Sequence, residues 1–299
     1  MKRGWFGAAI ALIVIGLAII TGTVIASGFD MKKLGGEEYE NREIAVTDSF
    51  SKIDIRVSIS DVEFKRSEDG TCKVVSWESK SYKHTMKTDD GVLKITSMEN
   101  RKWYEFTMFQ FDSPKVTVYL PEESYQSLSI KVSTGDVKIP SGFCFDTIEL
   151  TGSTGEVECK TGKANVVKIT SSTGNIELSG TEAGQIRIQT STGKVALSGI
   201  TAKEWLKVST STGNVSLKDV LSDGNMEVRT STGNVKLEDC DTTSMLIETN
   251  TGNVSGRLLS PKDFKTETST GSVKVPKSSS DETCKIKTST GNIKITVKE

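Results

Sequence analysis

The chain has 299 residues, and its 38 basic and 39 acidic side chains leave a formal net charge of −1. This balance gives no electrostatic reason to expect a nucleic-acid partner, which normally calls for a strongly basic face. Only 35% of the residues are hydrophobic and 6% aromatic, with 26 glycines and five prolines. Such a composition favours a thin, turn-rich β-structure over a thick helical core.

Residues 1–29 are predicted to form a signal anchor, a single transmembrane helix. The stretch Trp5–Phe29 holds no charged residue and follows the basic start Lys2-Arg3. At ~1.5 Å rise per residue it is long enough to cross a ~30 Å hydrocarbon core. A cleaved signal peptide is the alternative, because Val24-Ile25-Ala26 offers a possible cleavage site before Ser27. The length of the apolar run favours the uncleaved anchor.

Basic residues flank this segment on both sides, so the positive-inside bias is weak. We favour an inside N-terminus, which predicts a single-pass protein of the cell membrane with an extracytoplasmic β-domain. Residues 30–42, with Gly35-Gly36, are predicted to be a solvated stalk linker.

Residues 43–127 have strand patterns without a strict repeat and are predicted to form an irregular β cap. Ile53, Ile55, Val57 and Ile59 alternate with polar residues, the mark of a half-buried strand. Further strands are expected at 73–77, 91–95 and 115–120. His84 has no nearby cysteine cluster or acidic partner motif, so we interpret it as an ordinary surface histidine.

One segment of the cap resembles the repeats that follow it. Val57–Phe64 aligns with Val132–Ile139 without a gap. We therefore predict a degenerate first repeat, as expected where a terminal unit must shield the end of a stack.

Residues 128–299 contain a motif of the form Thr-Gly-Asn-Val that returns every 19 or 20 residues. Its glycines are Gly135, Gly155, Gly174, Gly193, Gly213, Gly233, Gly252, Gly271 and Gly291. A constant spacing over nine units predicts a solenoid in which each copy occupies the same place in a stacked coil.

Apolar residues stand at fixed offsets from each glycine, as Leu206, Val208, Val215 and Leu217 do around Gly213. Because they share one parity in each strand, they predict a strand–turn–strand unit with a narrow interior. An antiparallel meander is the alternative, but it needs a cover for its apolar face, and no helix-period segment after residue 30 supplies one. The Thr, Gly and Asn of the motif are interpreted as turn chemistry rather than a ligand site.

The cysteines are odd in number and contain no CxxC pair, so they indicate neither a zinc site nor a complete disulfide framework. They are Cys72, Cys144, Cys159, Cys240 and Cys284. Cys159 and Cys284 fall on the apolar columns, which favours structural thiols. One extracellular disulfide is the alternative.

The nine strand–turn units behind an N-terminal anchor, introduced by Val118-Tyr119-Leu120-Pro121, resemble the bacterial "putative adhesin" family of β-strand-repeat proteins. The resemblance covers residues 45–298. It implies a right-handed parallel β-helix in a cell-envelope protein of unknown function, with links to envelope stress in some members. It offers no catalytic residues.

The leading hypothesis is a non-enzymatic, membrane-anchored extracytoplasmic β-solenoid that acts as a scaffold or adhesin-like binding module for an envelope polymer or protein. Its exterior carries regular columns of mixed charge, and such flat repetitive faces suit extended partners. A polysaccharide-acting β-helix enzyme is one alternative, but no cluster of carboxylates occurs on neighbouring units. A regulatory partner of an envelope sensor is another. No cofactor, metal ligand or specific binding residue is indicated.

Overall fold

The computed structural model describes residues 2–26, 28, 38–99 and 113–298. The first element, α1, spans Lys2–Ala26, within the segment predicted as an anchor. Among the described residues, the structure offers no helix with enough apolar length to cross a bilayer, so the predicted transmembrane helix is not supported. The predicted 30–42 linker lies mostly outside the described residues, and its last residues belong to the first strand.

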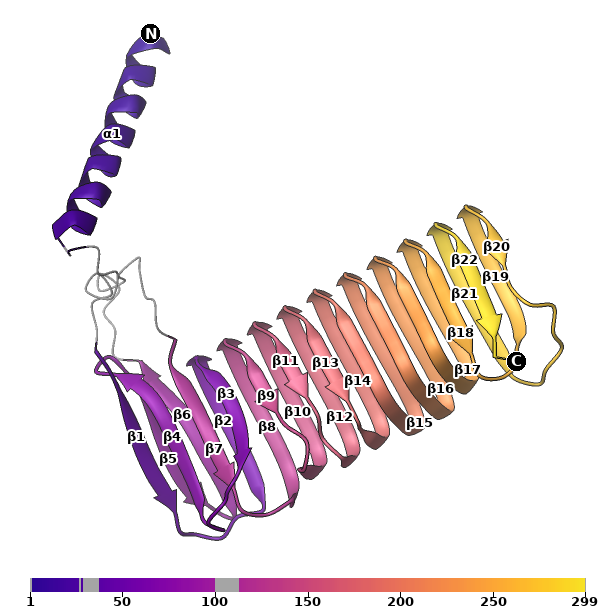
Figure 1. Ribbon diagram of the computed structural model, residues 1–299, viewed down its shortest axis with the longest axis horizontal. Helices are drawn as coiled ribbons and strands as arrows, with labels where there is room; N and C mark the ends of the chain where they lie inside the picture. The colour runs from indigo at the N-terminus through magenta and orange to yellow at the C-terminus, as the bar shows by residue number, and fades with distance from the viewer. Residues whose placement is uncertain (1, 27, 29–37, 100–112, 299) are drawn as a thin grey trace.

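The rest of the described chain forms a straight β-rod with a cap at its N-terminal end (Figure 1). The cap strands are β1 (Tyr39–Val46), β2 (Lys52–Ile59), β3 (Asp61–Arg66), β4 (Cys72–Ser79), β5 (Tyr82–Asp89), β6 (Val92–Glu99) and β7 (Lys115–Leu120). Strand β4 runs antiparallel to both β1 and β7, and β5 runs antiparallel to β6. Residues 100–112, between β6 and β7, lie outside the described residues.

Each rung of the rod has a strand before the repeat glycine and a strand after it. The strands are β8 (Ser124–Thr134), β9 (Val137–Ile139), β10 (Cys144–Thr154), β11 (Val157–Cys159), β12 (Lys163–Thr173), β13 (Ile176–Ser179), β14 (Glu182–Thr192), β15 (Val195–Thr212), β16 (Val215–Thr232), β17 (Val235–Thr251), β18 (Val254–Leu258), β19 (Asp263–Thr270), β20 (Val273–Lys274), β21 (Thr283–Thr290) and β22 (Ile293–Val297). The repeat glycine marks the first corner of each rung, and the second corner lies between the strand after that glycine and the first strand of the next rung. The long strands β15 to β17 continue round this second corner without a break.

Neighbouring rungs pair in parallel and in register. Leu206, for example, lies between Ile186 and Met226. This confirms the solenoid and excludes the antiparallel meander for the repeat region. The predicted first repeat is also confirmed, because Val57 pairs with Val132 and Val62 with Val137.

The stacking order departs from the sequence order at both ends of the rod. The β2–β3 coil lies between the β8–β9 rung and the later strands β6 and β7. At the other end, β21 lies between β17 and β19, and β22 lies between β18 and β20. The unit around Gly271 is therefore outermost, and the unit around Gly291 is enclosed (Figure 1).

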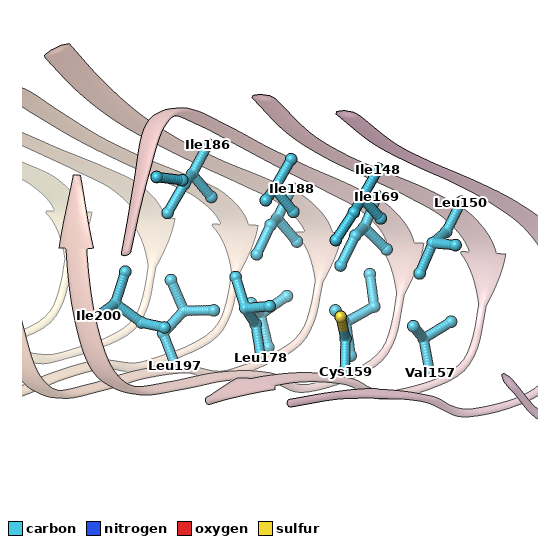
Figure 2. Packing of buried hydrophobic residues seen from close by; sticks show 14 of the residues in the cluster. Ile148, Leu150, Val157, Cys159, Ile169, Leu178, Ile186, Ile188, Leu197 and Ile200 are labelled. Atoms are coloured by element: carbon cyan, nitrogen blue, oxygen red, sulfur yellow. The ribbon is translucent and has the colours of Figure 1, made fainter. Parts of the chain in front are cut away.

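The core is a double row of apolar side chains that runs the length of the rod. Ile148, Ile169, Leu178 and Leu197 are each 1% exposed or less, and Figure 2 shows them stacked on their own kind. At ~0.8 kcal/mol per buried CH₂, each such residue contributes a couple of kcal/mol. Because ordering entropy offsets most of this gain, stability depends on neighbouring rungs.

All five cysteines are free thiols. Cys159 and Cys284 are fully buried in the apolar columns, as expected for structural thiols. The alternative of one extracellular disulfide is not supported, because none of the five cysteines is paired in this structure.

Candidate functional site

The nine repeat glycines form one corner of the rod, and close backbone approach explains them. Eight of the nine have a positive φ, which glycine adopts without strain. At Gly193, φ is +146°, and an added Cβ would lie 2.0 Å from the carbonyl oxygen of Gly174 in the preceding rung. At Gly213 the corresponding distance to the Gly193 oxygen is 1.9 Å. Each rung thus occupies the space that a side chain on the next would need.

The polar residues around these glycines are engaged with the protein's own backbone. The Asn214 Oδ1 accepts a hydrogen bond from the Asn234 backbone N–H, and the Asn234 Oδ1 accepts one from the Asn253 N–H, both at 2.8 Å. The hydroxyl of Thr230 donates to the carbonyl of Gly213 at 3.2 Å. These bonds tie one rung to the next, which favours turn chemistry over a ligand site at this corner.

The second corner carries a groove that crosses the first rungs of the rod. Its volume is about 570 Å³. It is lined by the first residues of β8, β10, β12 and β14 and by one residue of β15: Ser124, Tyr125, Cys144, Phe145, Asp146, Lys163, Ala164, Asn165, Glu182, Ala183, Gly184 and Lys203.

A change in side-chain size explains this groove. Tyr125 and Phe145 are buried at the corner and stack with their ring centroids 5.9 Å apart. In the next two rungs the corresponding residues are Ala164 and Ala183. Small side chains replace large ones while the backbone keeps its register, so the surface becomes hollow beyond the aromatic pair.

The rim of the groove is charged but balanced. Asp146 and Glu182 stand against Lys163 and Lys203, with 4.0 Å between the Lys163 amine and the Glu182 carboxylate. Lys203 lies 3.5 Å from the Asp223 carboxylate in the next rung. An apolar floor with a neutral rim suits an uncharged or zwitterionic ligand better than a polyanion.

Cys144 lies in this groove and gives it a chemical probe. Burial raises the pKa of the Cys72 and Cys240 thiols to about 11 and that of the Cys159 and Cys284 thiols to about 12. A thiol must ionise and be accessible in order to react. We therefore expect one thiol of the folded protein, Cys144, to react rapidly with a disulfide reagent. Cys144→Ser should abolish this fast phase, whereas a second fast equivalent in the native protein would contradict the burial of the other four.

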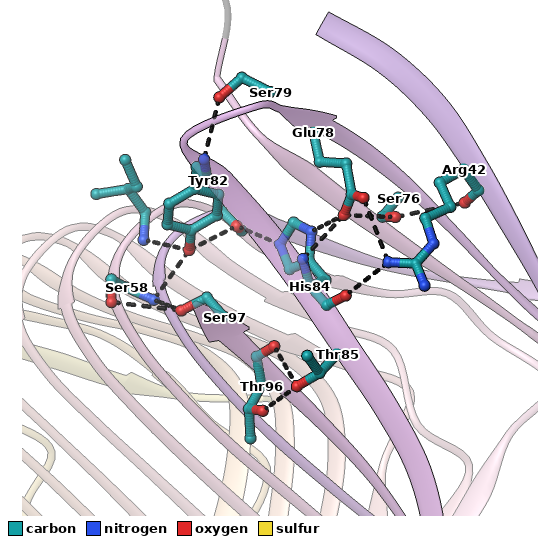
Figure 3. A network of polar contacts seen from close by, with 12 residues as sticks. Arg42, Ser58, Ser76, Glu78, Ser79, Tyr82, His84, Thr85, Thr96 and Ser97 are labelled. Atoms are coloured by element: carbon teal, nitrogen blue, oxygen red, sulfur yellow. Dashed lines mark hydrogen bonds and ion pairs between the residues drawn. The ribbon is translucent and has the colours of Figure 1, made fainter. Parts of the chain in front are cut away.

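The cap contains a buried polar network that sequence reasoning missed (Figure 3). His84 is fully buried, so its interpretation as a surface histidine is wrong. Its Nδ1 lies 3.3 Å from the Glu78 carboxylate, and its Nε2 lies 2.9 Å from the Ser60 hydroxyl. The Tyr82 hydroxyl accepts hydrogen bonds from the backbone N–H groups of Ser58 and Ile59 at 3.2 and 3.0 Å.

Ser60, His84 and Glu78 follow the order of a nucleophile, a base and an orienting acid. All three are at most 1% exposed, however, so no substrate reaches the Ser60 oxygen in this structure. The network instead joins β4 and β5 to the β2–β3 corner, and the Arg42 guanidinium lies 3.5 Å from the Glu78 carboxylate on the outer side. We interpret the network as a structural tie of the cap.

Burial lowers the pKa of His84, although the Glu78 carboxylate opposes this shift. For Glu78, burial alone would raise the pKa, but hydrogen bonds from the His84 backbone, Ser76 and the His84 ring outweigh it and lower the pKa overall. The folded state therefore favours a neutral imidazole beside an ionised carboxylate.

Acid should destabilise the cap through both groups. Below the ordinary histidine pKa of 6.5, His84 is protonated in the unfolded chain but stays neutral in the folded protein until a lower pH. The folded state therefore loses stability as the pH falls through this range. The Glu78 contribution is present above the ordinary glutamate pKa of 4.5 and is lost as the pH falls further. We expect the melting temperature to fall below about pH 6.5, with a smaller fall between pH 6.5 and 5 for His84→Gln. An unchanged profile in this variant would contradict the assignment.

Within the part of the chain that the structure describes, no three His, Cys, Asp or Glu side chains are placed to hold a metal ion. The model of the family described as Toastrack DUF4097 matches residues 50–296, from just before β2 into the last strand, β22. This chain belongs to the Toastrack family.

Two solved structures share the Toastrack fold of this chain. A protein from Bacteroides fragilis, named a putative adhesin, has a TM-score of 0.52 at 16% identity and covers 88% of this chain and 99% of its own. A protein from Parabacteroides distasonis, named a putative lipid binding protein, has a TM-score of 0.52 at 17% identity and covers 88% of this chain and 98% of its own. A comparison with curated proteins gives no match.

Proposed function

We propose that this Toastrack chain is a non-enzymatic binding module, held at the cell membrane by its N-terminal segment, with the rod on the extracytoplasmic side. The groove at the second corner is the binding surface. The observation that carries the proposal is the hollow left where Ala164 and Ala183 follow Phe145 in the stack. It runs along the rod and crosses several rungs, as a site for an extended polymer must.

The names of the structural neighbours support a binding role over an enzymatic one, since these proteins are called adhesin or lipid binding. The chemistry of the chain agrees. Its one serine–histidine–glutamate arrangement among the described residues is buried, and the groove rim alternates acid and base instead of gathering carboxylates. We propose an uncharged or zwitterionic envelope polymer as the ligand class.

The binding experiment fills the groove. Ala164 is half-buried on the groove floor, so Ala164→Trp should block the hollow. Lys236→Trp on β17 is the matched control, because Lys236 is exposed and lies outside the groove. We expect full-length protein in detergent to co-sediment with purified cell-wall sacculi, and Ala164→Trp to raise the dissociation constant at least tenfold, a loss of about 1.4 kcal/mol or more. Equal binding by both variants would contradict the groove.

Two further measurements distinguish the ligand and the location. Sacculi that occupy the groove should slow alkylation of Cys144, whereas phosphatidylglycerol vesicles should not; protection by vesicles alone would assign a lipid ligand instead.

Protease added to intact cells should cleave the β-rod, and carbonate extraction should leave the full chain in the membrane fraction. A rod that is protected until lysis would contradict the proposed topology.

A further inference from the structure

The outer edge of the last rung has no strand partner within the described chain. Strand β19 pairs with β21, and β20 pairs with β22, each on one side. Their other sides face away from the rod, at the end opposite the cap (Figure 1). An edge of this kind presents a row of backbone donors and acceptors to which another strand can add.

The interior of the rod is also open at this edge. Phe264, Val273 and Val275 line a hollow of about 700 Å³ together with Pro276. Val273 is 44% exposed, whereas its counterpart in the adjacent rung, Ile293, is 1% exposed. The apolar columns that are covered in every inner rung therefore end in contact with solvent.

The charges on β19 favour one particular partner. On the paired side, Lys265 lies opposite Lys285, a like charge, while Glu267 lies opposite Lys287 with 3.2 Å between amine and carboxylate. The Lys265 amine lies 3.8 Å from the carboxylate of Asp263 on its own strand, which is a long distance for an ion pair. On its open side, Lys265 thus suits an acidic residue and Glu267 suits a basic one.

A second copy of the same strand supplies both. In an antiparallel pair, facing residues have numbers with a constant sum, so a register with Thr266 opposite the partner's Thr266 sets Lys265 opposite the partner's Glu267. By symmetry, Glu267 then faces the partner's Lys265. Facing pairs of opposite charge stabilise an antiparallel sheet, whereas facing like charges destabilise it. This register satisfies both charges of each chain.

We infer that the chain forms an end-to-end dimer through β19, with a two-fold axis at Thr266. The two open ends of the core close on each other, and the interface is isologous, so assembly stops at two copies. Because the cap and the β19 edge lie at opposite ends of the rod, the two caps stand at the far ends of the dimer. If the rod is extracytoplasmic, as proposed above, such a dimer bridges two membranes and acts as a homophilic adhesin. This role rests on the proposed location, whereas the dimer itself does not.

Charge reversal tests the register. Lys265→Glu sets two glutamates opposite each other in a homodimer, and Glu267→Lys sets two lysines opposite each other. A mixture of the two variants restores both opposite-charge pairs. Sedimentation of the full-length protein in detergent over a concentration series should show dimers for the unaltered chain, at least a tenfold weaker dimer for each variant alone, and recovery in the mixture. An unaltered chain that stays monomeric, or a mixture that fails to recover, would overturn the inference.

Cross-linking locates the axis. Facing residues in an antiparallel pair have Cα atoms ~4.5–5.5 Å apart, within reach of a disulfide. Thr266→Cys should therefore cross-link to itself on mild oxidation. In the same register Ser269 faces the partner's Asp263, and the two Ser269 residues lie roughly 20 Å apart, so Ser269→Cys should not cross-link. Equal cross-linking of the two variants would contradict the register.

These outcomes are separable from those of the binding experiment. Dimerisation is measured without sacculi, and Ala164→Trp should leave it unchanged because the groove lies on other rungs. A monomer that still binds sacculi would refute the dimer alone. A dimer that binds no sacculi would refute the groove alone.

Discussion

Gly193→Ala should destabilise the rod by about 3 kcal/mol or more. The added Cβ would lie 2.0 Å from the Gly174 carbonyl oxygen and 2.6 Å from its carbon, and these atoms belong to the backbone of a paired rung. The strain at a φ of +146° adds to this clash. Urea unfolding of the full-length protein in detergent, followed by β-sheet circular dichroism, measures the loss.

Gly180→Ala is the matched control. Gly180 also has a positive φ, +64°, but nothing lies within 4 Å of its Cβ position. In later rungs Asp219 and Asp239 follow the paired residues Lys218 and Glu238 with φ of 52° and 53°, so the site accepts a side chain. We expect a cost of about 1 kcal/mol. If the two alanine variants lost equal stability, close packing of the rungs would not explain the repeat glycines.

Lys262→Met should weaken the C-terminal end by about 2 to 3 kcal/mol. Lys262 is completely buried, and its amine contacts the Asp241 carboxylate at 2.5 Å and the Glu282 carboxylate. Methionine fills a similar volume but leaves two carboxylates facing each other without the cation. Because these carboxylates are 30% and 39% exposed, we expect a smaller loss than for fully buried ions.

The position of Lys262 gives this loss a local signature. Asp241 belongs to β17, Lys262 immediately precedes β19, and Glu282 immediately precedes β21, so the cluster joins three rungs in their stacked order. Amide hydrogen exchange should accelerate in β21 and β22 before it does in β12 or β14. Lys285→Met is the control, since Lys285 is exposed on β21 and its replacement should change stability by less than about 0.5 kcal/mol. Uniform acceleration along the rod would exclude this local role.

Most of the fold can be predicted from the sequence, because each rung repeats the same glycine position and the same apolar positions. The spacing of the glycines fixes the rung length, and the alignment of Val57–Phe64 on Val132–Ile139 predicts the register that the structure shows. The inverted order of the last two rungs does not follow from spacing, because either order keeps every glycine in its column. A signal was present in Thr266, a polar residue in an otherwise apolar column, which marks an exposed rung.

The two polar features of the molecule differ in how far they could be predicted. The burial of Glu78 could be predicted, because side chains alternate between the two faces of a strand and Glu78 lies on the same face of β4 as the buried Val74. The contact of His84 with Ser60 was not, since it depends on how β5 packs across the β2–β3 corner. The groove had a sequence signal in the series Tyr125, Phe145, Ala164 and Ala183, which recurs at the rung period. A ligand for it carries no such signal, because recognition depends on surface shape and not on a repeated constraint.

The enclosed position of β21 and β22 sets an order of events during synthesis. Residues 263–274 leave the ribosome before residues 283–297, yet they stack outside them. At the ~5–20 residues per second of translation, β19 and β20 wait on the order of a second for the rung that separates them from β17 and β18. Until then, the nascent rod ends at the Gly252 rung, with β19 free to pair wrongly. In that shorter stack Lys262 has the Asp241 carboxylate but lacks the Glu282 carboxylate, which it contacts in the finished structure.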